Sequence, residues 1–155
     1  MKRTFALMLA LILCLALAAV PAMAEPELVC YFEDVELHLP ASWAGKLLML
    51  PTATGATFYQ KASYDRYMQD GLEGGGFLFS LDACVNNSYQ ELPSYIDLGL
   101  SERSAMHYYL ELPSDYPAYM QDDIRAEYDA MYAQIDEIVD SVVIYGEDAE
   151  AEPAP

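Results

Sequence analysis

The chain has 155 residues, and its 25 acidic side chains outnumber seven lysines and arginines, giving a formal charge of −18. Such a surface repels phosphate backbones and anionic lipid, which argues against nucleic-acid binding and against direct binding to anionic membranes. It is expected to attract cations, basic peptides or cationic polymers, and the alternative is that the charge only keeps the protein soluble. The length fits one ordinary domain.

The first 24 residues have the features of a secretory signal peptide. Lys2 and Arg3 form a basic start, an apolar run covers residues 5–20, and residues 22–24 (Ala-Met-Ala) supply the small-x-small pattern that a signal peptidase reads. The run is nearly long enough for a membrane helix, but no second apolar segment of about 18 residues follows it. We therefore predict cleavage after Ala24 and an exported protein.

A lipid anchor at Cys14 is the alternative to this cleavage. Leu13 stands where a lipoprotein peptidase prefers Gly, Ala or Ser, and Cys14 lies inside the apolar run, so cleavage after Ala24 is favoured. Removing residues 1–24 leaves 131 residues with five basic against 25 acidic side chains, a formal charge of −20.

Cys30 and Cys84 remain after this cleavage. An even pair in an oxidising compartment is a candidate disulfide, and two buried free thiols are the alternative. The sequence leaves both open. No C-x-x-C motif or basic neighbour indicates a reactive thiol at either position.

Short apolar and alternating runs predict several strands before residue 113. Residues 28–39 end in an alternation typical of a half-buried strand, with Val35, Leu37 and Leu39 opposing Glu36 and His38. Further strands are predicted at residues 46–50, 57–59, 77–85, 95–100 and 105–112, with a hairpin tip at 54–55, while 64–72 is left unassigned before a Gly-rich turn.

The hydrophobic period changes after Pro113, which predicts one long helix. Apolar residues recur at steps of three and four on one helix face, at Met120, Ile124, Tyr128, Met131, Ile135, Ile138 and Val142. Ser114 or Asp115 can cap its start and Gly146 marks its end, after which residues 146–155 form an acidic tail predicted to be disordered. The sequence thus predicts a single α+β domain over 25–145, an antiparallel sheet covered by one long C-terminal amphipathic helix.

An ordered series of segments carries a resemblance to known proteins. These segments are 39–46 (L-P-A-S-W-A-G-K), 58–64 (F-Y-Q-K-A-S-Y), 75–80 (G-G-F-L-F-S) and 112–115 (L-P-S-D). Over most of residues 28–145 the chain resembles a group of uncharacterised exported or lipid-anchored domains of Firmicutes. The resemblance implies an exported Gram-positive context and supplies no catalytic residues. More distantly, the chain is similar to PsbP-like and DcrB-like folds, mostly non-enzymatic accessory proteins.

The two histidines are the sharpest candidates for a metal site. Glu36 and His38 share a face of one predicted strand, and His107 and Glu111 share a face of another. If these strands are neighbours, the four residues could hold zinc or another divalent ion. The alternative is that both histidines face solvent and bond to water or a nearby acid. No spacing such as H-E-x-x-H fixes a geometry, and no cofactor is predicted.

Other catalytic patterns are weak. Residues 74–76 (Gly-Gly-Gly) lack the Lys-Ser/Thr of a phosphate-binding loop, and a tight turn explains them better. Residues 99–103 have Arg where a nucleophile elbow needs its second Gly. Cys84 with His107 as nucleophile and base lacks a local signature. Paired acids, which glycoside hydrolysis requires, are so common here that they are more typical of solvated faces.

The thirteen tyrosines are the remaining unusual feature. Tyr128 and Tyr132 fall on or beside the apolar helix face and are interpreted as packing residues. Other tyrosines could line a groove for sugar rings or an extended peptide, because an aromatic face combines apolar contact with a polar tip. These are Tyr59, Tyr64, Tyr67, Tyr109, Tyr116 and Tyr119. Ordinary amphipathic surface is the alternative.

Together these patterns favour a non-enzymatic binding or accessory domain of the bacterial cell envelope or extracellular space. It is expected to recognise a peptide, a protein or a glycan through an aromatic and acidic surface. The alternative is a small extracytoplasmic hydrolase or metalloprotein that uses His38, His107 and nearby carboxylates. A purely structural envelope component is the third possibility.

Overall fold

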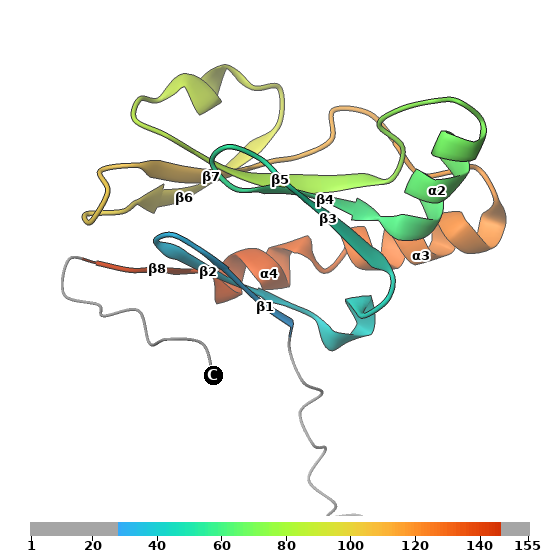
Figure 1. Ribbon diagram of the computed structural model, residues 1–155, viewed down its shortest axis with the longest axis horizontal. Helices are drawn as coiled ribbons and strands as arrows, with labels where there is room; N and C mark the ends of the chain where they lie inside the picture. The colour runs from blue at the N-terminus through green and yellow to red at the C-terminus, as the bar shows by residue number, and fades with distance from the viewer. Residues whose placement is uncertain (1–27, 147–155) are drawn as a thin grey trace, which may run out of the picture.

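The computed structural model describes residues 28–146 (Figure 1). The predicted signal peptide and residues 147–155 of the predicted tail lie outside this range. The elements in chain order are β1 (Leu28–Phe32), β2 (Val35–Leu39), η1 (Ala41–Trp43), β3 (Leu47–Pro51), β4 (Ala56–Gln60), α2 (Lys61–Gln69), β5 (Phe77–Cys84), η2 (Ser88–Glu91), β6 (Tyr95–Leu100), β7 (His107–Glu111), α3 (Asp122–Tyr132), α4 (Ile135–Ser141) and β8 (Val143–Ile144). Within the described range, no helix has the length and apolar character needed to cross a membrane.

The fold is mixed α+β, but the strands of residues 28–146 form two antiparallel sheets. Sheet A has the order β1-β2-β8, and sheet B has the order β3-β4-β5-β7-β6. The prediction of a single sheet is therefore wrong. A two-residue turn at Glu33 and Asp34 folds β1 onto β2, and the chain then passes through η1 into the edge strand of the other sheet. Alternation along a strand shows which side chains face a core, and it does not show which strand lies alongside.

The long C-terminal helix is also not formed as predicted. It is broken into α3 and α4 near Gln134, whose N–H bonds to the Met131 carbonyl three residues earlier. The chain leaves the helix after Ser141, and Val143 and Ile144 pair with β2. These β-branched residues pack well in a strand, so a pattern that also fits the helix period ends in a sheet. The unassigned stretch 64–72 contributes most of its length to α2.

The core lies between the two sheets and the α3–α4 layer, as the ribbon in Figure 1 shows. The predicted alternation in β2 is confirmed, since Val35, Leu37 and Leu39 are buried. Phe58 stacks on Phe79 at the centre of sheet B with ring centroids 4.6 Å apart. The helices add the buried side chains Ile124, Tyr128, Met131, Ile135 and Ile138, as their 3.6-residue period requires.

A buried carboxylate joins the two sheets. Asp34, in the β1–β2 turn, is only 1% exposed. Ser101, just after β6, donates its hydroxyl to Asp34 Oδ2 at 2.8 Å, and Arg103 Nε lies 3.5 Å from Oδ1. A buried charge is tolerated where such partners compensate for lost hydration. This contact fixes the turn of sheet A to the β6–β7 connection of sheet B.

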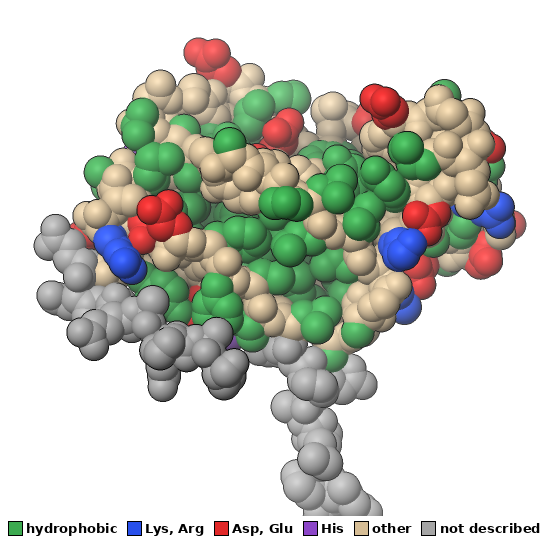
Figure 2. Space-filling model, in the orientation of Figure 1, with side chains coloured by type: hydrophobic (Ala, Val, Ile, Leu, Met, Phe, Trp, Pro, Cys, Tyr) green, Lys and Arg blue, Asp and Glu red, His purple; other side chains and the backbone are tan. Residues whose placement is uncertain are grey.

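The acidic character of the chain is not spread evenly over its surface. In Figure 2, hydrophobic side chains gather over the middle of the face where β3 lies in Figure 1, and acidic side chains lie around them. β3 is an edge of sheet B without a charged residue, and its Met49 is 44% exposed. The surface on this side of the domain is therefore available for apolar contact.

Candidate functional site

The segment between β7 and α3, residues 113–121, brings tyrosines together at one end of sheet B; we call it the tyrosine loop. Pro113 and Pro117 have fixed φ angles and no N–H donor, so they favour neither a continued strand nor an early helix. The loop is consequently an irregular connection, and it carries Tyr116 and Tyr119 past the side of α2 and the start of α3.

Backbone contacts hold this loop in place. Ala118 is fully buried, the Gly76 N–H donates to the Pro117 carbonyl at 2.7 Å, and the Tyr119 N–H donates to Ser63 Oγ at 2.9 Å. Gly76 has a φ of +78°, and a Cβ there would lie 2.5 Å from the Gln60 carbonyl oxygen. The Gly-rich turn is thus needed for close backbone packing beside the loop.

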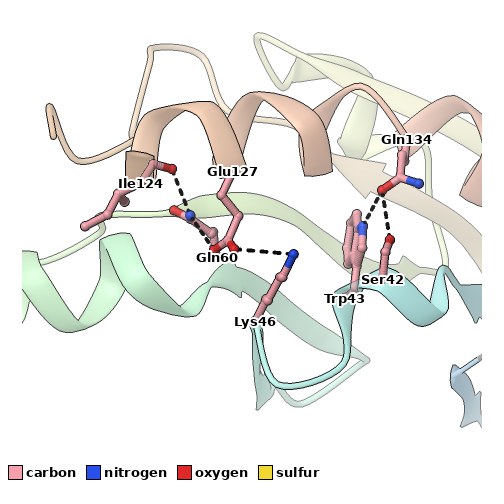
Figure 3. A network of polar contacts seen from close by, with 7 residues as sticks. All are labelled: Ser42, Trp43, Lys46, Gln60, Ile124, Glu127 and Gln134. Carbon is pink, nitrogen blue, oxygen red and sulfur yellow. Dashed lines mark hydrogen bonds and ion pairs between the residues drawn. The ribbon is translucent and has the colours of Figure 1, made fainter. Parts of the chain in front are cut away.

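A buried glutamine connects the anchor of the loop to the helix above it (Figure 3). Gln60 accepts a hydrogen bond from the Ser63 hydroxyl, and its Nε2 donates to the Ile124 carbonyl at 2.9 Å and to Glu127 Oε1 at 3.1 Å. The Lys46 ammonium lies 3.4 Å from the second carboxylate oxygen of Glu127. This network satisfies a fully buried amide and sets the position of α3 relative to the tyrosine loop.

The same figure shows how η1 is attached to the helix break. Trp43 Nε1 donates to Gln134 Oε1 at 2.8 Å, and the Ser42 hydroxyl donates more weakly to the same oxygen at 3.4 Å. Trp43 is fully buried, so its indole N–H needs such a partner. The residues of Figure 3 are therefore structural supports for the loop and the helices.

A first hollow lies between the tyrosine loop and α3; we call it the cage hollow. Its volume is about 220 Å³ and its lining consists of Pro113, Ser114, Asp115, Tyr116, Pro117, Tyr128, Asp129 and Tyr132. The Tyr116 ring stands edge-on to Tyr128 at 5.6 Å between centroids, and Tyr132 lies nearly parallel to Tyr128 at 6.0 Å. Tyr116 and Tyr132 are 49% and 37% exposed, so ring surface remains available to a ligand.

Hydrogen bonds orient these rings. The Tyr128 hydroxyl donates to the Phe77 carbonyl at 2.7 Å, and the Tyr116 hydroxyl donates to Asp129 Oδ1 at 2.6 Å. Burial and the bond to Asp129 raise the pKa of Tyr116 to about 12, and burial raises that of Tyr128 as well. Both phenols therefore stay neutral at ordinary pH, and the acidic side chains provide the charge of the hollow.

A second, more open hollow of about 420 Å³ lies on the other side of the loop, lined by Tyr67, Leu72, Tyr119, Met120 and Gln121. Tyr67 and Tyr119 meet edge to face at 5.5 Å, and the Tyr119 hydroxyl donates to Asp70 at 2.9 Å. That hydrogen bond is the main reason that the pKa of Tyr119 is raised. This hollow is mostly apolar and suits a hydrophobic or aromatic side chain.

Comparison of the chain with family models finds no match, and comparisons with curated proteins and with solved structures find none either. The site is therefore interpreted from its own geometry.

The four candidate metal ligands are not brought together. Glu36 and His38 lie on β2 in sheet A, where the His38 Nε2–Glu36 Oε1 distance is 2.7 Å and the Tyr145 hydroxyl donates to Glu36. His107 and Glu111 lie on β7 in sheet B. The idea that these strands are neighbours is wrong, because the strands belong to different sheets. Within residues 28–146 no group of three or more His, Cys, Asp or Glu side chains could hold a metal ion.

The cysteines are also separated. Within the described residues, Cys30 in β1 and Cys84 at the end of β5 are free thiols in different sheets, so the candidate disulfide is not formed. Burial raises the pKa of Cys30, as expected for an inert thiol. Cys84 is opposite His107 in the β5–β7 ladder, but its thiol donates to the Asn86 carbonyl. The imidazole Nδ1 is buried without a hydrogen-bond partner among residues 28–146, so no nucleophile–base contact is formed.

The structure separates the tyrosines suggested as ligand contacts. Tyr67 lines the second hollow, whereas Tyr59 and Tyr64 pack edge to face against each other at 5.2 Å. Tyr109 stacks on Tyr89 on the outer side of sheet B. Tyr116 and Tyr119 are the two suggested tyrosines that the loop itself contributes.

Sequence reasoning missed that Tyr128 and Tyr132 line a hollow in addition to packing in the core. The available signal was their spacing of four residues, which places two rings on one helix face beside a segment bounded by two prolines. It also missed Asp115 and Asp129, because acidic residues are too common in this chain for any one to be conspicuous.

Proposed function

We propose that this protein is an exported, non-enzymatic binding domain that recognises a partner through the tyrosine loop. The observation that carries the proposal is the pair of solvent-open hollows on either side of one anchored segment, with three tyrosines in the lining of one and two in that of the other. Tyrosine provides rigid contact area with a polar tip, which is why it is enriched in recognition surfaces. Export is supported by the basic start, apolar run and Ala-Met-Ala ending of residues 1–24.

The supporting network favours binding because the loop is ordered before any partner arrives. Its backbone bonds to Ser63 and Gly76, and the amide of Gln60 ties this anchor to α3. A preformed surface loses less conformational entropy on association. Binding without turnover is favoured over hydrolysis, because His38 and His107 lie in different sheets and the Cys84 thiol donates to the Asn86 carbonyl.

Selection from a random peptide library tests this function, with a glycan array as a parallel arm. The test variant combines Tyr116→Ala with Tyr119→Ala, and the control is Tyr31→Ala, a 60% exposed tyrosine on β1 of the other sheet. We expect sequences or glycans enriched by the unmodified protein and the control to be lost with the double variant. Equal enrichment by all three proteins, or enrichment by none, would contradict the proposal.

The export step has its own test. Expression of the full chain in a Gram-positive host, followed by N-terminal sequencing of the extracellular fraction, is expected to show Glu25 as the first residue. Retention of the protein in the cytoplasm would count against export, and lipid attached at Cys14 would replace simple cleavage by the lipoprotein alternative.

A further inference from the structure

The size of the cage hollow restricts what it can hold. Sites that enclose a whole small-molecule ligand usually measure about 300–1,000 Å³. The cage hollow, at about 220 Å³, is smaller, and it opens to solvent between the loop and α3. It therefore fits one side chain or one small head group of a larger partner, with the rest of the partner lying outside.

Its walls are aromatic on several sides. Tyr116 and Tyr128 are nearly perpendicular, with an interplanar angle of 75°, and Tyr132 lies within 16° of parallel to Tyr128. The face of an aromatic ring carries partial negative charge and attracts a cation placed within about 6 Å of its centroid. Tyr128 is only 2% exposed, so the rings that a cation can contact are those of Tyr116 and Tyr132.

The charge of the hollow also favours a cation. Asp115 and Asp129 both contribute to its lining, and none of the lining residues within 28–146 is a lysine, arginine or histidine. The nearby Arg125 is paired with Asp122 at 3.2 Å on the first turn of α3. One Asp129 oxygen accepts from Tyr116, so the carboxylate is held beside the ring. An acidic and aromatic hollow in a chain of charge −18 repels anions.

We propose that the cage hollow binds an organic cation, an ammonium or guanidinium group, through the exposed rings of Tyr116 and Tyr132 and through Asp115 and Asp129. This inference deepens the proposed function and rests on it. The group can come from a lysine or arginine side chain of a partner protein or from a small free amine such as an amino sugar. Both sources present the same chemistry to the hollow, a compact organic cation with N–H donors.

The test is an NMR titration of the ¹⁵N-labelled protein with choline and with its neutral carbon analogue, 3,3-dimethylbutan-1-ol, at constant ionic strength. We expect choline to shift the amide signals of Asp115, Tyr116 and residues 128–132 in a saturable way and the alcohol to leave them nearly unchanged. Separate titrations with Nα-acetyl-lysine amide, Nα-acetyl-arginine amide and glucosamine distinguish the two sources of the cation.

Variants separate charge from ring. Asp129→Asn and Tyr132→Leu are each expected to weaken choline binding about two- to fivefold, whereas Tyr132→Phe retains the ring and the affinity. Asp136→Asn, an exposed acid on α4, is the matched control and is expected to change nothing. Because Asp129 and Tyr132 are exposed, these variants are expected to fold, and their urea midpoints verify this.

The outcomes distinguish this inference from the function on which it rests. Equal shifts with choline and the alcohol would overturn the cation site and leave the tyrosine loop as an apolar binding surface. The absence of shifts from every cation, combined with peptide or glycan selection that still depends on Tyr116 and Tyr119, would do the same. If selection also fails to depend on those tyrosines, the cation site and the proposed function both fall.

Discussion

Tyr89, on the outer side of sheet B, and Tyr116, in the cage hollow, make similar contacts and differ in accessibility. In the Tyr89 cluster, on the outer side of sheet B, Tyr89 stacks on Tyr109 at 5.1 Å, meets Tyr95 edge-on at 5.3 Å and donates its hydroxyl to Asp97 at 2.8 Å. Its side chain is only 2% exposed. In the cage hollow, Tyr116 makes the same kinds of contact, a ring edge and a carboxylate, yet it is 49% exposed.

The two rings differ in how the segment that carries each one is packed against the domain. Tyr89 belongs to the short η2 helix, which folds its ring against β6 and β7, so both ring and hydroxyl serve the fold. Tyr116 belongs to a loop anchored from below at Pro117, Ala118 and Tyr119, which leaves the ring facing solvent. A count of tyrosines therefore cannot identify a recognition surface; the anchoring of the segment that carries them does.

The largest effect is expected when Tyr89 and Tyr116 are each replaced by alanine and the two variants are compared. Tyr89→Ala removes a buried ring together with its contacts to Tyr95 and Tyr109, and we expect it to lower the melting temperature by about 10 °C or more. Tyr116→Ala removes a half-exposed ring, so a decrease of about 3 °C or less is expected together with loss of selected ligands. Differential scanning calorimetry measures both. Similar losses of stability in the two variants would show that the hollow is part of the core.

A smaller effect is expected from replacement of Gln60, whose amide supports the tyrosine loop. Gln60→Leu keeps the volume but leaves the Ser63 hydroxyl and Glu127 without their partner, and we expect a loss of about 1–3 kcal/mol in the free energy of unfolding. Ser42→Ala, at the exposed end of the same polar region, is the control and is expected to cost much less. Urea unfolding gives the free energies, and hydrogen exchange at the Tyr119 amide shows whether the loop loosens. Unchanged exchange in the Gln60 variant would mean that the loop is held by other contacts.

The raised pKa of Tyr116 also predicts that the stability of the protein depends on pH in the alkaline range. An unfolded tyrosine loses its proton near pH 10, whereas Tyr116 in the fold keeps its proton until its pKa of about 12. The folded state binds more protons between these values, so stability falls as the pH rises from 10 to 12. Urea midpoints across this range measure the slope, which Tyr116→Phe should reduce. An unaltered slope in Tyr116→Phe would assign the effect to other buried tyrosines.

The smallest effect is expected from removal of metal ions. Because the two candidate histidines lie in different sheets, EDTA should leave the melting temperature of the protein unchanged. Elemental analysis before and after dialysis checks the same point. A transition metal bound at about one ion per chain, with a large decrease in melting temperature on EDTA treatment, would instead support the metalloprotein alternative.

Much of the secondary structure follows from sequence because it depends on local periodicity. The alternation of Val35, Leu37 and Leu39, the apolar run of β5 and the helical period through Ile124, Tyr128 and Met131 are all found where the pattern predicts them. The exceptions depend on contacts between distant segments. The Val142-Val143-Ile144 run fits both a helix end and a strand, and only the free edge of β2 decides for the strand.

The candidate site was less predictable. The chain contains 13 tyrosines and 25 acids, so neither residue type singles out a position. Tyr67 was suggested and lines a hollow, whereas Tyr59, Tyr64 and Tyr109 pack against other rings. Asp115 and Asp129 gain a role only because the loop returns beside α3. Such contacts join residues distant in sequence, and no local pattern encodes them.

The sequence by itself determined the charge, the elements with strong hydrophobic periods, and the signal-peptide features on which the export proposal rests, because each is a property of consecutive residues. Tertiary structure decided that the strands divide into two sheets, that the candidate metal ligands lie apart and that Tyr89 is buried while Tyr116 is half exposed. The physical reason is that pairing of strands and packing of rings depend on which surfaces of distant segments fit together. Those fits are settled only when the whole core forms.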